Sequence, residues 1–120
     1  MAISYDQLND ELKKKIEEFE TVKQNYDFIV NQRIHLESVL RETELAIEEL
    51  EKVDPTEVVY KSIGGILIRS KQDKLLDEKK SQKVSLDMKI KTLKQKEERI
   101  KNQIKTMSQS IQSELKNQSA

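Results

Sequence analysis

The sequence predicts a mainly α fold: a long antiparallel two-helix coiled coil with a β-hairpin at the bend. Three observations lead to this prediction. The 120 residues include only two glycines and one proline, so long segments run without backbone breakers. Charged residues make up 37% and hydrophobic residues 35%, which is too little apolar material for a thick globular core. Apolar residues recur at alternating steps of three and four on both sides of a central segment that holds both glycines, as in a coiled coil.

The N-terminal arm of the coiled coil is expected over residues 4–52. Steps of three and four meet 14 positions along this arm, of which 11 are apolar, and the register does not break. Ser4 and Gln7 have the spacing of a capping box, which marks a helix start. Asp54-Pro55 cannot continue a helix. The sequence therefore predicts one helix from Ser4 to Lys52.

The C-terminal arm is expected over residues 74–117, followed by a tail at 118–120. The same alternation meets 12 positions there, of which 8 are apolar. Ser70 or Asp73 can serve as the N-cap. The first arm carries a net charge of −6 and the second, with its tail, +6. A parallel homodimer would place like charges side by side, so the charges favour an antiparallel pairing of the two arms within one chain. Residues 1–120 are therefore expected to form a single domain.

The segment between the arms, residues 53–73, has the pattern of a β-hairpin. Two β-branched and aliphatic runs, Glu57–Lys61 and Ile66–Ser70, flank Ser62–Gly65. Glycines at a tight turn supply the positive φ angles that hairpin turns need. We expect Tyr60 to lie opposite Leu67 and Val59 opposite Ile68, which gives sensible cross-strand pairs.

This hairpin is expected to form an oligomerisation surface. A lone two-stranded hairpin is marginally stable in water, and this one carries apolar residues on both faces and two open edges. Hairpins of other chains could cover it by pairing edge to edge into a larger sheet or closed β-barrel platform. The alternative is that the hairpin folds down onto its own helices. The expected oligomerisation residues are Val58, Val59, Tyr60, Gly64, Gly65, Ile66, Leu67 and Ile68.

The same segment resembles a family. Residues 57–69 contain the pattern V-Y-K-x-x-G-x-x-L-I-x and stand between two coiled-coil arms. In this respect the chain resembles an archaeal-like prefoldin subunit of the β type, which has one hairpin where the α type has two. The resemblance implies a cytoplasmic, ATP-independent holdase whose hairpins form a barrel with α-type subunits and further β-type copies, as a hetero-hexamer. It also implies that the coiled-coil tips capture unfolded client proteins and deliver them to a group II chaperonin.

The residues themselves point to the same tips. A hairpin at the bend brings both ends of the chain to the far end of the coiled coil. A two-helix seam covers its apolar stripe on one side only, so apolar groups near helix ends stay partly accessible. The alternative is that each of them merely closes the seam. The candidate client-binding residues are Tyr5, Leu8, Leu12, Phe19, Met107, Ile111 and Leu115.

Several function classes find no support in the sequence. There is no phosphate-binding or zinc-protease motif, no cysteine, and His35 is the one histidine, so we expect no catalytic residue, cofactor or metal site. Apolar runs are too short for a membrane span, and no secretory signal is visible. Basic residues of the second arm spread around the helix without aromatic partners, so we expect no nucleic-acid binding. The competing function is a structural coiled-coil scaffold that binds one folded partner.

Overall fold

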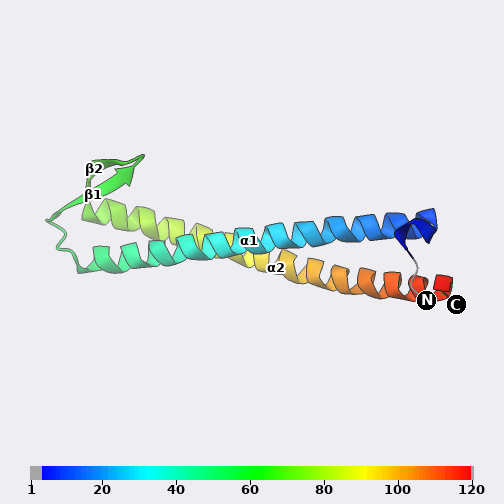
Figure 1. Cartoon of the computed structure of the whole chain (residues 1–120). Helices are drawn as coiled ribbons and strands as arrows, with labels where there is room; N and C mark the ends of the chain where they lie inside the picture. The colour runs from blue at the N-terminus through cyan, green and yellow to red at the C-terminus, as the bar shows by residue number, and fades with distance from the viewer. Residues whose placement is uncertain (1–3, 120) are drawn as a thin grey trace. The chain divides into compact units, whose positions relative to one another are not determined.

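The computed structural model describes residues 4–119 and contains two long helices with a two-stranded hairpin between them (Figure 1). In chain order these are a short 3-10 helix η1 (Tyr5–Gln7), α1 (Asp10–Lys52), β1 (Val58–Ile63), β2 (Ile66–Lys71) and α2 (Gln72–Ser119). The predicted mainly α fold with a central hairpin is confirmed. The chain divides into two compact units, which are described one at a time.

Unit 1 consists of residues 1–32 and 93–120, of which 4–32 and 93–119 are described. It pairs the beginning of α1 with the end of α2. Lys15 of α1 forms an ion pair with Glu114 of α2. Further along, Val22 and Met107 line one groove between the two helices. Later residues of α1 thus meet earlier residues of α2, so the helices are antiparallel in this unit, as the charge pattern predicts.

Unit 2 consists of residues 33–92 and contains the hairpin. Most of the buried residues of the described chain lie here, on the facing sides of α1 and α2. At the hairpin end, the side-chain amide of Gln72 donates a hydrogen bond to the backbone oxygen of Leu50 (2.8 Å), and Lys80 forms an ion pair with Glu51 (3.8 Å). The buried seam residues of this unit are Thr43, Leu50, Leu75, Leu86 and Ile90.

The α1 helix begins later than predicted. Ser4 and Gln7 do interact, since Gln7 Oε1 accepts a hydrogen bond from the Ser4 N–H (3.0 Å), but they enclose only η1. The residues on either side of η1 are extended, with ψ 157° at Ser4 and 150° at Leu8. Asn9 Oδ1 accepts a hydrogen bond from the Leu12 N–H (2.8 Å). Asn9 is therefore the cap of the long helix, because its side chain satisfies a free N–H of the first turn.

The α2 helix is longer than predicted at both ends. It begins at Gln72, directly after β2, so neither predicted N-cap holds: Ser70 lies in β2, and Asp73 lies in the first helical turn, where its Oδ1 accepts from the Lys74 N–H (2.8 Å). Residues 118 and 119 continue the helix instead of forming a tail, and Ala120 lies outside the described residues.

The predicted strand register is wrong by two residues. Tyr60 pairs with Arg69 and Val59 with Ser70, while Ile63 pairs with Ile66. The reason is the turn, because Gly64 (φ 54°) and Gly65 (φ 83°) together form its two central positions. A two-residue hairpin turn with positive φ at both positions strongly prefers glycine at each. Since the shift is even, each side chain keeps the face that the predicted register assigned to it.

Candidate functional site: the hairpin and the paired helix ends

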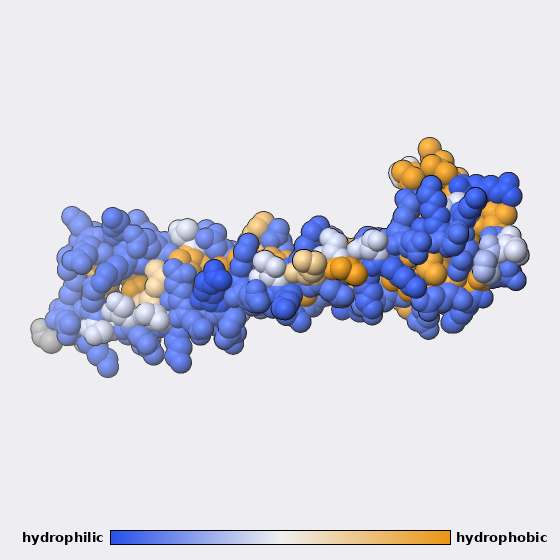
Figure 2. All heavy atoms as spheres, turned by 180° about the vertical axis from the view of Figure 1, so that it is seen from behind, coloured by the Kyte–Doolittle hydropathy of each residue, from blue (hydrophilic) through white to orange (hydrophobic). Residues whose placement is uncertain are grey.

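The hairpin of unit 2 presents most of its apolar side chains to solvent. Leu67 is 69% exposed and Ile66 is 66% exposed, and Val58, Tyr60 and Ile68 are exposed as well. Figure 2 shows the corresponding orange patch over the hairpin. Among the described residues, the sheet has two strands, so each strand keeps one unpaired edge. The chain's own helices therefore leave this apolar surface uncovered.

One face of the hairpin makes limited contact with α2. Val59 and Lys61, on the same face of β1, are half-buried. Lys61 Nζ lies 2.8 Å from Glu78 Oε2 on α2, and this hydrogen bond lowers the pKa of the Glu78 carboxyl below its usual range. The alternative prediction, a hairpin folded onto its own helices, thus holds for this attachment but not for the exposed apolar residues.

The loop before β1 is ordered by local hydrogen bonds. Asp54 Oδ1 accepts hydrogen bonds from the backbone N–H of Thr56 (2.8 Å) and from its hydroxyl (2.7 Å). The backbone hydrogen bond contributes most to lowering the pKa of the Asp54 carboxyl. This Asx-type turn follows the end of α1 at Lys52, which agrees with the predicted stop, and leads the chain into β1.

In unit 1, the candidate client-binding residues differ in accessibility. Leu12 has no exposed surface and Leu8 is 7% exposed, so in this conformation these two close the seam. Tyr5 is exposed. The remaining four are half-buried between α1 and α2: Phe19, Met107, Ile111 and Leu115.

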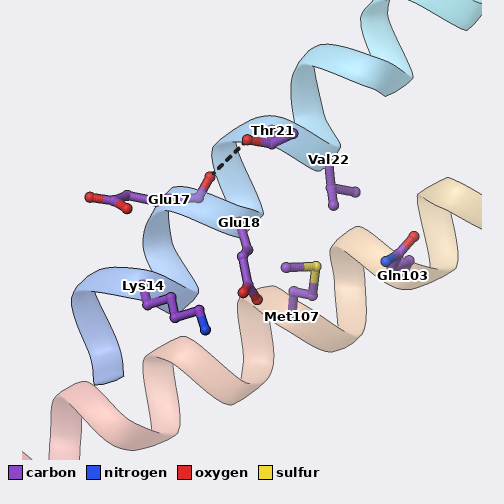
Figure 3. Close-up of a pocket in the computed structure, with 7 residues that line it drawn as sticks. All are labelled: Lys14, Glu17, Glu18, Thr21, Val22, Gln103 and Met107. Carbon is purple, nitrogen blue, oxygen red and sulfur yellow. Dashed lines mark hydrogen bonds between the residues drawn. The ribbon is translucent and has the colours of Figure 1, made fainter. Parts of the chain in front are cut away.

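A groove runs between the two helices of unit 1, with a volume of about 490 Å³. Figure 3 shows Met107 of α2 and Glu18 of α1 pointing toward each other across it. A neighbouring groove of about 250 Å³ shares Met107 and also includes Ile111. Both grooves combine apolar walls with charged rims. The residues of the first are Lys14, Glu17, Glu18, Thr21, Val22, Gln103 and Met107.

The charged rim of this groove was not predicted, because Lys14 and Glu18 lie outside the heptad positions that the pattern singles out. The Lys15–Glu114 ion pair lies at the second groove, and its hydrogen bond raises the pKa of the Lys15 ammonium. A flexible methionine beside aliphatic groups can adapt to varied apolar partners. The arrangement is therefore suited to binding an extended or helical apolar segment.

Within residues 4–119, no group of three or more histidine, cysteine or acidic residues is placed to hold a metal ion. In the same range, neither long helix is apolar enough to cross a membrane.

Comparison with known proteins gives consistent results. A family model described as "Prefoldin subunit" matches residues 7–118. The Prefoldin subunit beta of Archaeoglobus fulgidus is 31% identical over 109 residues, covering 91% of this chain and 94% of that protein. The Prefoldin subunit beta of Pyrococcus furiosus is 28% identical over 99 residues, covering 82% and 85%. The crystal structure of the prefoldin beta subunit from Thermococcus strain KS-1 has the same fold, with a TM-score of 0.78, 24% identity and coverage of 89% and 94%.

Proposed function

This chain belongs to the prefoldin family, as its hairpin segment predicts, and we propose that it is the β-type subunit of a hetero-oligomeric, ATP-independent holdase. The observation that carries the proposal is the exposed apolar hairpin between two paired helices. The subunit assembles through the hairpin with α-type subunits and further β-type copies into a hetero-hexamer. It acts in the cytoplasm, captures non-native proteins and delivers them to a group II chaperonin.

Assembly through the hairpin is favoured because its apolar side chains are exposed in the single chain. Side chains such as Leu67 and Ile66 gain about 1.5–3 kcal/mol each when they are fully buried, and both are mostly exposed in the single chain. A neighbouring hairpin can cover these side chains and also pair with an open strand edge, so both contributions favour a larger sheet. Tyr60 lies on the same face as Leu67, and Val59 and Ile68 lie on the opposite face with Ile66. The glycine turn keeps the two strands in register.

Client binding is assigned to the paired helix ends of unit 1. The half-buried Phe19, Met107 and Ile111 offer small apolar patches beside the grooves. One such patch binds an unfolded segment weakly, but several subunits in one complex bind it at several points, and the combined affinity rises accordingly. Because the proposed mechanism has no nucleotide step, client release follows from weak binding at each point or from competition by the chaperonin.

The assembly proposal is tested by native mass, measured for the chain alone and mixed with an α-type subunit. We expect complexes much larger than the 14.1 kDa monomer. Leu67→Lys should weaken assembly, because it places a charge on the buried surface. The matched control is Val84→Lys on α2, a residue of similar exposure at 60%, which should leave assembly intact. A persistent monomer both in the chain alone and in the mixture with the α-type subunit would refute the proposal.

The holdase proposal is tested by suppression of aggregation of denatured clients. We compare the complex that contains the full chain with one trimmed to residues 20–104, which lacks Tyr5, Leu12, Phe19 and the end of α2. The trimmed complex should protect less. Several unrelated clients are used, since a scaffold for one folded partner would bind none of them. Equal protection by the trimmed complex would show that the helix ends are not the contact.

A further inference from the structure

The first residues that the structure describes, 4–8, fold back along α1 instead of extending it. Tyr5 Oη donates a hydrogen bond to Glu17 Oε1 at 3.0 Å, and Lys13 Nζ lies 5.6 Å from the centre of the Tyr5 ring. In a continuous helix, twelve residues would separate Tyr5 and Glu17 by ~18 Å, too far for this hydrogen bond. Residues 4–8, drawn in dark blue at the start of α1 in Figure 1, are called the N-terminal flap below.

Burial shows what the flap covers. The other candidate residues of the seam in this unit, Phe19, Met107 and Ile111, stay partly exposed. By contrast, Leu12 has no exposed surface, although it lies close to the start of α1. Leu12 lies one turn before Lys15, which pairs with Glu114, so one side of Leu12 faces α2. The flap, with its buried Leu8 and its Tyr5 beside Lys13 and Glu17, lies along this part of α1, and we therefore assign the remaining cover of Leu12 to it.

We propose that the N-terminal flap occupies the client-binding end of unit 1 as an internal competitor, and that a client segment binds there by displacing it. This inference rests on the proposed holdase function and deepens it. Displacement uncovers Leu12 next to the half-buried Leu115 and Ile111, so the apolar surface offered to a client grows when the flap leaves. Tyr5 and Leu8, predicted as client contacts, act instead as the residues that a client replaces.

The flap also indicates which client segments fit. Its Tyr5 places an aromatic ring beside Lys13 and a hydroxyl on Glu17, and Leu8, three residues later, is itself buried. A client segment with an aromatic residue three positions before an aliphatic residue can make the same contacts. A segment with acidic residues at these positions would meet the Glu17 carboxylate and bind poorly.

The experiment compares client affinity for assembled complexes that contain the full chain or a chain lacking residues 1–8. The deletion keeps Asn9, whose side chain caps α1, so the helix itself is retained. A tethered segment competes at an effective concentration in the millimolar range. Removing a competitor that buries one leucine should tighten client binding by about tenfold. Unchanged or weaker binding after the deletion would overturn the inference.

A locked variant tests the opposite direction. The chain has no cysteine, so Tyr5→Cys with Glu17→Cys introduces a unique pair of thiols. Joining them with a short bismaleimide holds the flap closed and should reduce client capture, while the same variant capped with a monofunctional maleimide should bind at least as well as the full chain. Equal capture by the joined and capped forms contradicts the inference.

The labelling rate of a thiol introduced by Leu12→Cys measures, without any client, whether the flap covers position 12. The thiol should react slowly in the full chain and at least several-fold faster without residues 1–8, and equal rates would show that the flap does not cover position 12. This separates the two hypotheses. If the full chain captures no client, the proposed function fails, and with it the competitor role; if it captures clients but the deletion changes neither affinity nor labelling, only the flap inference fails.

Discussion

The turn of the hairpin gives the sharpest prediction, because its two glycines adopt a backbone conformation that other residues avoid. Gly65 has φ 83°, and a Cβ added there meets no atom within 4 Å. Gly65→Ala therefore causes no clash, and its whole effect is backbone strain. A left-handed conformation costs an L-residue about 1–2 kcal/mol. The equilibrium constant for forming the hairpin from its open state should fall by about 5- to 30-fold.

Amide hydrogen exchange measures this effect directly. Protection of the strand amides of Lys61 and Ile68 should fall in Gly65→Ala by the same factor, whereas amides near Leu86 in α2 should keep their protection. Gly65→Asn is the matched control, because asparagine tolerates the left-handed region. The strand amides of this variant should lose clearly less protection than those of Gly65→Ala. Assembly with an α-type subunit should weaken in the same order. Equal losses for alanine and asparagine, or none for alanine, would refute the argument from positive φ.

Three further predictions concern the helices and their attachment to the hairpin. Leu86→Ala in the buried seam should lower the free energy of unfolding by about 2–5 kcal/mol, while Met88→Ala, 67% exposed, should change it by about 0.5 kcal/mol or less; thermal or denaturant unfolding distinguishes them. Asn9→Ala should destabilise the start of α1 by about 1 kcal/mol, seen as faster exchange of the first helical amides, and Asn9→Asp should not. Because Lys61 lowers the folded-state pKa of Glu78, their contact stabilises the hairpin above the unfolded-state pKa and is lost as the pH falls through the folded-state value. Hairpin exchange should therefore rise as the pH falls below the usual pKa of a glutamate, and Glu78→Gln should reduce that dependence.

Hydrophobic periodicity predicts the two long helices well, because each seam residue contributes to one repeating signal. It fails at Leu8, which continues the heptad spacing although the helix has not yet begun. There the competing signal is local: the Asn9 side chain caps the backbone about one turn after the start that the periodic pattern predicts. The strand register fails for a similar reason. Cross-strand pairing of Tyr60 with Leu67 looks favourable by itself, but the two glycines decide the turn, and the turn decides the register.

The accessibility of the residues at the proposed client-binding end could not be predicted from the sequence. The sequence places Tyr5, Leu12 and Met107 on one seam, and nothing in the spacing shows that Leu12 is fully buried or that Met107 lines a groove. Accessibility depends on a third element at the seam, and such an element has no periodic signature of its own. The reversal at Leu8 is visible in the sequence only as a cap residue, Asn9, that competes with the predicted start at Ser4.

The distribution of burial within the chain connects these local features to the proposed function. In unit 2, Thr43 is buried in the seam without an unmet polar group, because its hydroxyl donates to the backbone oxygen of Val39 (2.8 Å), and Leu86 and Ile90 add apolar cover. This unit therefore has a small but complete core beside the surface proposed for assembly. Among the described residues of unit 1, the buried ones are Leu8 and Leu12, and both belong to the proposed flap arrangement. With few buried contacts, this unit opens at low free-energy cost, which is what displacement of a flap by a client requires.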